Sequence, residues 1–279
     1  MRMSESELKN NAILYSYPGG ELDIICFSDR GIIGPGWEAD EAETAKRAKR
    51  EKGKKSEGED RLRSMRRARA NLRRLALAND FQYFVTLTLD GDKIDRYDGA
   101  AIVKRLNQWT SNMVQRHGLR YVLVPERHKD GAFHFHGFFT GDGLQLIDSG
   151  TITMAGWKHP RRPRSTAQRA KWLSEGGRVV YNLPQWTLGF STALELYGTY
   201  SSAVGYVCKY IGKQDGERAL GRWYYSGGAL RQPDKEYVTL DYRELREDFK
   251  GECVELEIPG SSLLVIHTKQ EEENGNHGS

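Results

Sequence analysis

The chain has 279 residues, enough for one large domain or one domain with elaborations. Its hydrophobic content of 38% and charged content of 29% describe a polar protein, and no apolar stretch approaches the ~20 residues of a membrane helix. The N-terminal residues lack an apolar core, so we expect no signal peptide. The three widely spaced cysteines are typical of free thiols in a reducing cytoplasm rather than of a disulfide framework.

Charge is unevenly distributed, although the net charge is only +4. Residues 41–78 carry 14 Lys/Arg against 6 Asp/Glu, whereas residues 241–279 carry 4 against 10. A concentrated basic segment favours a polyanionic partner. A solvated helix face at one end and a disordered acidic tail at the other would explain the same asymmetry.

The first part of the chain is expected to form a β-rich segment over residues 1–40 and a basic amphipathic helix within residues 41–78. Apolar residues recur every three or four positions from Arg61 to Ala78, with arginines between them. Such a helix packs its apolar stripe on a domain, and its arginines could also lie along a DNA backbone. The candidate DNA contacts on this helix are Arg66, Arg67, Arg73 and Arg74.

The middle of the chain predicts alternating strands and helices. Residues 84–89 have the composition of a strand, and Asp98 is a good N-cap for a helix that ends at Gly118. Residues 119–139 then read as a hairpin around a turn at residues 129–131. The expected buried stripe of the helix is Ile102, Leu106, Trp109 and Met113.

A further strand is expected at residues 186–193, and Ser201 or Ser202 would cap the helix that follows it. The order β-α-β-β-insertion-β-α predicts an α+β fold, with a central antiparallel sheet flanked by helices and related to the ferredoxin-like motif. This core would span residues 79–215. Residues 216–279 would form a C-terminal segment with an acidic, partly disordered tail.

Residues 142–185 interrupt this order and are rich in Gly, Pro and Arg. A stretch of this length between core elements is usually a functional insertion or a mobile loop. We expect it to contact DNA through Arg161, Arg162 and Arg164; a surface loop without function is the alternative.

The most informative stretch is the apolar run at residues 132–139, which places His134 and His136 two residues apart. On a β-strand alternate side chains share a face, so both imidazoles would point the same way and form half of a divalent-metal site. Two histidines hydrogen-bonded to the sheet are the alternative. A histidine-triad nucleotide hydrolase is disfavoured, because its third alternating position is Phe138 here.

The third metal ligand depends on the turn of the hairpin. If residues 129–131 form a three-residue loop, His128 faces Ala132 and Glu126 sits opposite His134, about 5 Å away. A two-residue loop would shift the register by one and turn Glu126 to the other face. Glu126 is therefore the predicted third ligand, and His128 is the second choice. Two imidazoles and a carboxylate suit Mg²⁺ or Mn²⁺ in phosphate chemistry.

Two phenols and two ammonium groups follow at helical spacing: Tyr206, Lys209, Tyr210 and Lys213 would share one helix face. Tyrosine, with an ordinary pKa near 10, is a poor nucleophile unless a cation polarises the phosphate and a neighbour favours the phenolate. The lysines could supply that neighbour. The alternative is a pair of half-buried tyrosines with lysines extended beside them.

Three segments, in this order, resemble the motifs of rolling-circle replication initiators of the HUH superfamily. Residues 84–89 look like the first motif, and residues 134–136 look like the His-hydrophobic-His second motif. Residues 206–213 look like the third motif in its two-tyrosine form, which is similar to initiators of microviruses, filamentous phages and bacterial plasmids. The resemblance covers residues 79–215.

The resemblance implies an HUH nuclease fold with an RRM-like sheet, and metal-dependent nicking at a replication origin through a 5′-phosphotyrosyl intermediate. It implies His134, His136 and Glu126 as ligands of Mg²⁺ or Mn²⁺. Tyr206 and Tyr210 would be alternating nucleophiles. Thr86 and Thr88, in the first motif, would have a mainly structural role.

The expected partners are single-stranded or supercoiled origin DNA, a host helicase and a host DNA polymerase, with no membrane, in the cytoplasm of a bacterial host. The sequence contains no Walker-type phosphate loop, so strand separation would fall to the host helicase.

Other functions share parts of this pattern. A conjugative relaxase usually places its tyrosines before the histidine motif, and a single-strand transposase of the same superfamily typically has one tyrosine. A non-catalytic DNA-binding regulator with a structural ion would tolerate loss of both tyrosines. A metal phosphodiesterase would use water and release free ends.

Overall fold

The computed structural model describes residues 10–28, 57–196, 200–211, 213, 218–258 and 261–269. The described chain divides into two compact units. One unit combines residues 10–28 with the described residues from 232 onward, and the other is the described part of residues 56–231. The segments expected at the two ends of the chain therefore contribute to the same unit. Among the described helices, none is both long and apolar enough to cross a membrane.

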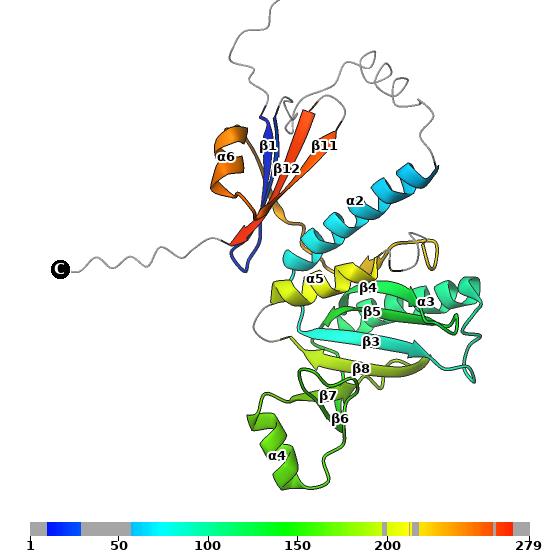
Figure 1. Cartoon of the computed structure of the whole chain (residues 1–279). Coiled ribbons are helices and arrows are strands. Elements are labelled where there is room, and N and C mark those ends of the chain that lie inside the picture. Colours follow the sequence, from blue (N-terminus) through cyan, green and yellow to red (C-terminus); the bar gives the residue numbers. More distant parts are fainter. Residues whose placement is uncertain are drawn as a thin grey trace, which may run out of the picture. The chain divides into compact units, whose positions relative to one another are not determined.

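In its described residues, the first unit is a five-stranded antiparallel sheet with one helix (Figure 1). The strands expected in residues 12–27 are confirmed, while residues 29–56 lie outside the described residues, as does the acidic tail from residue 270. Small and aliphatic side chains, among them Ala12, Ile24 and Leu264, form its buried core. In sheet order the strands are β10 (Asp234–Val238), β1 (Ala12–Ser16), β2 (Glu21–Phe27), β12 (Ser261–Lys269) and β11 (Cys253–Ile258), and the helix is α6 (Tyr242–Asp248).

The described part of the second unit is a seven-stranded antiparallel sheet with four helices, so the predicted α+β class with a central antiparallel sheet is confirmed. In sheet order the strands are β6 (Ile147–Thr153), β7 (Arg178–Asn182), β8 (Gly189–Glu195), β3 (Tyr83–Leu89), β5 (Phe133–Thr140), β4 (Arg120–Arg127) and β9 (Tyr225–Gly227). The helices are α2 (Glu57–Leu77), α3 (Gly99–His117), α4 (Thr166–Ser174) and α5 (Tyr200–Tyr210).

Helix α3 closes one face of this sheet. The carboxylate of Asp98 accepts hydrogen bonds from the backbone N–H groups of Ala100 and Ala101, and Gly118 ends the helix at φ 62°, as predicted. The predicted stripe of α3 is buried against Phe135, Phe139 and their neighbours. Because odd-numbered residues of β5 supply this core, its even-numbered residues face the other side of the sheet, where α5 lies.

The β4–β5 hairpin has the three-residue turn on which the prediction of the third ligand depended. The N–H of His128 donates to the carbonyl of Ala132 at 2.8 Å, and Gly131 adopts φ 89° within the turn. Glu126 consequently pairs with His134 in the ladder. The predicted register is confirmed, and it places the carboxyl group and both histidines on the face opposite α3.

Helix α2 packs on α5 through its apolar stripe, which includes the buried Leu72 and Leu75. The guanidinium of Arg69 donates to the carbonyl of Ile211 at 2.8 Å through Nε, which ties α2 to the end of α5. The amphipathic helix is thus confirmed from residue 57 to residue 77, and the earlier part of the predicted basic segment lies outside the described residues.

The insertion at residues 142–185 is largely regular structure. It contributes β6, α4 and β7, which extend the main sheet beyond β8 (Figure 1). Its Gly- and Pro-rich composition is compatible with a mobile loop, but cross-strand pairing between β6 and β7 orders it.

Three local predictions were wrong. The strand expected at residues 186–193 begins at Gly189, because Trp186 leaves the sheet to enter the core and donates its indole N–H to the carbonyl of Thr88 at 3.1 Å. Ser201 and Ser202 lie inside α5 rather than before it. Lys213 lies beyond the end of α5 and reaches the site from the following turn.

Candidate active site

The two histidines of β5 are oriented by hydroxyl groups of the neighbouring strand β3. Nδ1 of His134 lies 3.2 Å from Oγ1 of Thr88, and Nδ1 of His136 lies 3.1 Å from Oγ1 of Thr86. Each hydrogen bond fixes one ring nitrogen and leaves Nε2 to face the site, as the second shell of a metal-binding histidine does. The two threonines of the first motif therefore contact the histidines of the second.

Glu126 lies between the histidine strand and the segment after α5. Its Oε2 is 2.8 Å from Nε2 of His136, and its Oε1 accepts from Nζ of Lys213 at 3.1 Å. Burial by itself would raise the pKa of Glu126, but the hydrogen bonds from His136 and Lys213 outweigh it, so this pKa lies below its usual value. The carboxyl group is therefore ionised at neutral pH.

The environment of His134 favours a neutral imidazole. Burial, followed by the neighbouring His128 and His136, holds the pKa of His134 below its usual value. The ring of His128 lies 5.1 Å from the ring of His134, and its Nδ1 is 3.3 Å from the carboxylate of Asp130. Because the neutral imidazole is the form that ligates metals, His134 offers a suitable donor.

The donor chemistry of this face suits a divalent cation, since two imidazoles and one carboxylate meet on adjacent strands. Within the described part of the chain, however, no three His, Cys, Asp or Glu side chains are already gathered as a metal-binding group. Glu126 instead holds His136 and Lys213. A cation bound by Glu126 and His136 would replace their mutual hydrogen bond.

Helix α5 places its two tyrosines directly against the histidine strand. The ring of Tyr210 stacks on His136, with centroids 4.1 Å apart and planes 13° apart. Its hydroxyl donates to the hydroxyl of Tyr206 at 2.7 Å. The phenol-bearing turn and the imidazole pair thus share one site, as the chemistry predicted from the sequence requires.

The tyrosines differ in their access to solvent. Tyr206 is 50% exposed, whereas Tyr210 is 6% exposed. Burial raises the pKa of Tyr210, and the contact with Tyr206 raises this pKa further. In this arrangement Tyr206 is the phenol that an incoming phosphate can reach.

The two candidate lysines occupy different positions. Nζ of Lys213 lies 4.0 Å above the ring of Tyr210 while it is hydrogen-bonded to Glu126. Lys209 is exposed on α5, within one turn of the tyrosines. Lys213 therefore belongs to the arrangement around Glu126, and Lys209 lies at the solvent-facing side of the helix.

Phe84 is a site residue that the sequence patterns did not single out. Its ring lies 5.9 Å from that of Tyr206 and 6.3 Å from that of His136. It shares strand parity with Thr86 and Thr88, and this was the signal in the sequence that could have identified it. Its ring packs beside the exposed phenol.

The candidate DNA contacts lie at two places in the second unit. On α2, Arg66 and Arg67 are exposed or nearly so in sequence position beside the buried stripe, and the remaining two candidates, Arg73 and Arg74, are half-buried. In the insertion, Arg161 and Arg164 are exposed, and the guanidinium of Arg161 lies 4.5 Å from the ring centroid of Trp157. Arg162 is also exposed. Both arginine groups thus lie on elements other than the strands and helix that carry the histidines and tyrosines.

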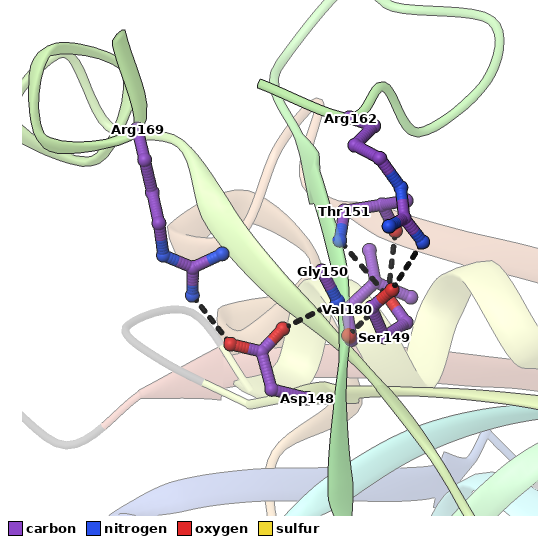
Figure 2. Close-up of polar contacts among 7 residues, drawn as sticks. All are labelled: Asp148, Ser149, Gly150, Thr151, Arg162, Arg169 and Val180. Carbon is purple, nitrogen blue, oxygen red and sulfur yellow. Dashed lines mark hydrogen bonds and ion pairs between the residues drawn. The ribbon is translucent and has the colours of Figure 1, made fainter. Parts of the chain in front are cut away.

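A bulge in β6 anchors the insertion (Figure 2). The register shifts between Asp148 and Thr151, and the hydroxyl of Ser149 donates to the carbonyl of Val180 at 2.6 Å. Asp148 holds Arg169 of α4 at 2.6 Å, and the carbonyl of Ser149 accepts from Arg162 at 3.3 Å (Figure 2). One bulge thus ties both the helix and the arginine-rich segment to the sheet.

A family model described as replication-associated protein ORF2 matches residues 82–215. The match supports a replication initiator family. The matched segment, just under half of the chain, contains β3, both histidines, Glu126 and both tyrosines of the initiator-like site. Comparisons with curated proteins and with solved structures find no match.

Proposed function

We propose that this chain starts rolling-circle replication as a metal-dependent enzyme that nicks and rejoins DNA at an origin. The observation that carries the proposal is the stacking of Tyr210 on His136 at 4.1 Å, with Tyr206 hydrogen-bonded to Tyr210. This geometry joins the nucleophile-bearing turn to the face on which a phosphate-polarising cation would bind.

In the proposed first transfer, the phenol oxygen of Tyr206 attacks the scissile phosphorus. A bond from that oxygen to phosphorus forms as the bond from phosphorus to the 3′ oxygen breaks. The products are a 5′-phosphotyrosyl ester and a 3′-hydroxyl, and the phenol proton is transferred, through solvent, to the departing 3′ oxygen. Energy of the broken bond is conserved in the ester, so rejoining needs no nucleotide cofactor.

Mg²⁺ or Mn²⁺ held by His134, His136 and Glu126 would withdraw charge from the phosphate oxygens. Thr86 and Thr88 keep the imidazoles oriented toward that position. Tyr210 donates to the oxygen of Tyr206 and so positions it for attack. Tyr210 becomes the second nucleophile when the transfer at Tyr206 has opened the contact between them.

Exposed arginines of α2 and of the insertion are proposed to hold the phosphate backbone. Their contribution does not depend on base sequence and falls with salt. A host helicase and a host polymerase would act on the nicked origin, because the reaction leaves a free 3′-hydroxyl.

The test is incubation of the protein with labelled circular single-stranded DNA of its replicon and Mn²⁺, followed by a denaturing gel. A labelled band at the protein's position, absent when a chelator is present, is expected. Cut DNA with no such band would indicate a phosphodiesterase that uses water. Binding without cutting would indicate a regulator.

His136→Ala separates catalysis from binding. It should abolish cleavage while leaving most of the salt-dependent DNA binding, because that binding rests on Lys and Arg. Loss of both would mean that His136 holds the fold rather than the reaction.

A further inference from the structure

One row of side chains crosses four strands on the site face of the main sheet. Phe190 of β8 pairs with Thr88 of β3, Thr88 pairs with His134 of β5, and His134 pairs with Glu126 of β4. Directly paired residues of antiparallel strands point to the same face. Phe190 therefore lies on the face of the candidate active site, in the same row as two of its predicted ligands.

Phe190 is 68% exposed, more than any other large hydrophobic side chain in the described part of the chain. It stands in the middle of the sheet's order, between β7 and β3, rather than at a free edge. Helix α5 packs over β4 and β5, so the part of the face formed by β8 is left open (Figure 1). Thr192, the next residue of β8 on this face, is also exposed.

We infer that Phe190 is a stacking platform for an unpaired base of single-stranded DNA beside the scissile phosphate. The inference rests on the proposed function, since it places that phosphate near His134. Two strand spacings, about 10 Å, separate β8 from β5. A strand of DNA whose phosphate lies at the histidines therefore carries a neighbouring nucleotide over Phe190.

Single-stranded DNA fits this surface better than duplex DNA. A single strand offers the flat faces of its bases to an aromatic ring, whereas in a duplex those faces are stacked on one another. The exposed ring of Phe190 is flanked by the threonine hydroxyls of β3 and β8 rather than by Lys or Arg. Stacking rather than phosphate attraction is the interaction that this part of the face supplies.

The test compares binding of a labelled oligothymidylate and of a duplex of equal length, without divalent cations, so that no cleavage occurs. Phe190→Ala should weaken binding of the oligothymidylate roughly tenfold, the range expected for loss of one stacked base. Phe190→Trp should bind as the unaltered protein does. Duplex binding should change less than about twofold in both variants, because it rests on phosphate contacts.

Tyr97→Ala is the matched control. Tyr97 is 55% exposed, but it lines a cavity of about 590 Å³ with Phe133 and Val103 of the α3 side. Its loss should leave oligothymidylate binding unchanged. Equal weakening in the two alanine variants would overturn the inference, because any exposed aromatic would then suffice.

Unchanged oligothymidylate binding by Phe190→Ala would also overturn the inference, as would an equal loss of duplex binding. The proposed function fails by a different measurement, the absence of a covalent protein–DNA band. If the Phe190→Ala variant forms this band and binds oligothymidylate as well as the unaltered protein does, the proposed function stands and only the platform is lost.

Discussion

Tyr206 and Tyr210 lie one helical turn apart, yet their surroundings give them different chemistry. Tyr206 is half exposed beside Phe84, and Tyr210 is buried against His136. Both can be reached by the same backbone phosphate only in succession. Their order of action therefore follows from access rather than from position in the sequence.

Single substitutions should separate the two tyrosines. Tyr206→Phe should slow formation of the first covalent adduct on the order of 1,000-fold or more, because it removes the accessible nucleophile. Tyr210→Phe should slow it less than about tenfold, because it removes only the hydrogen bond to Tyr206. Single-turnover measurement of adduct formation gives both rates. The reverse ranking would show that the buried tyrosine acts first.

His134 should make the stability of the second unit sensitive to acid. Its pKa in the folded state lies below the ordinary value of 6.5, so the unfolded chain binds the proton more readily. Its contribution to stability is present above the unfolded pKa and is lost as pH falls through it toward the folded pKa. From pH 7.5 to pH 5, the urea midpoint should therefore fall further for the unaltered protein than for His134→Gln. Parallel losses would assign the acid sensitivity to other groups.

At the scale of elements, the hairpin was the most predictable part of the site. A three-residue turn ending in glycine sets the β4–β5 register locally, and the register in turn decides that Glu126 faces the histidines. The cap of α3 was predictable for the same reason, since Asp98 and Gly118 act within one turn of the helix. Local chemistry was sufficient in both cases.

Contacts between distant elements were not predictable from the sequence. The position of Lys213 depends on where α5 ends and on Glu126, which lies 87 residues earlier. The order in the insertion depends on a bulge whose Ser149 hydroxyl reaches Val180. The exposure of Phe190 depends on how far α5 extends over the sheet. None of these has a periodic signal along the chain.

Two glycines give a matched test of the sheet and of α5. A Cβ on Gly137 would lie 1.8 Å from the carbonyl oxygen of Val122, whereas a Cβ on Gly205 meets nothing within 4 Å. Gly137→Ala should lower the free energy of unfolding by at least about 3 kcal/mol. Gly205→Ala should raise it by about 0.5–1 kcal/mol, because it lies within a helix. Similar effects in urea unfolding would contradict the described packing of β5 on β4.

Helix α2 offers a second matched pair. Leu72 is fully buried and Leu62 is 48% exposed on the same helix. Leu72→Ala should cost about 3 kcal/mol of unfolding free energy, and Leu62→Ala less than about 0.5 kcal/mol. Equal costs in urea unfolding would mean that α2 does not pack as described.

At the scale of the whole molecule, the described chain consists of two units, and the candidate site lies entirely within one of them. That unit is a continuous stretch of sequence, residues 56–231, while the other combines both ends of the chain. A fragment of residues 56–231 should therefore unfold cooperatively by itself and keep the metal-dependent adduct reaction. Calorimetry and the gel assay check the two statements, and a fragment that folds but forms no adduct would place part of the reaction in the other unit.

The family match to residues 82–215 coincides with the part of the chain in which sequence motifs were legible. Strand parity and helical spacing brought both histidines and both tyrosines into view, and the structure places Tyr210 against His136. The five-stranded sheet could be anticipated only as short strands, because its partners lie more than 200 residues apart in the sequence.

The central claim is that a phenol of α5 becomes covalently joined to DNA. Protease digestion of the adduct formed with circular single-stranded DNA and Mn²⁺, followed by mass spectrometry, identifies the joined residue. We predict a nucleotide-bearing peptide modified at Tyr206 in the unaltered protein, and no adduct when Tyr206 and Tyr210 are both changed to phenylalanine. A linkage to any residue other than these two tyrosines, or an adduct that persists in the double variant, would contradict the claim.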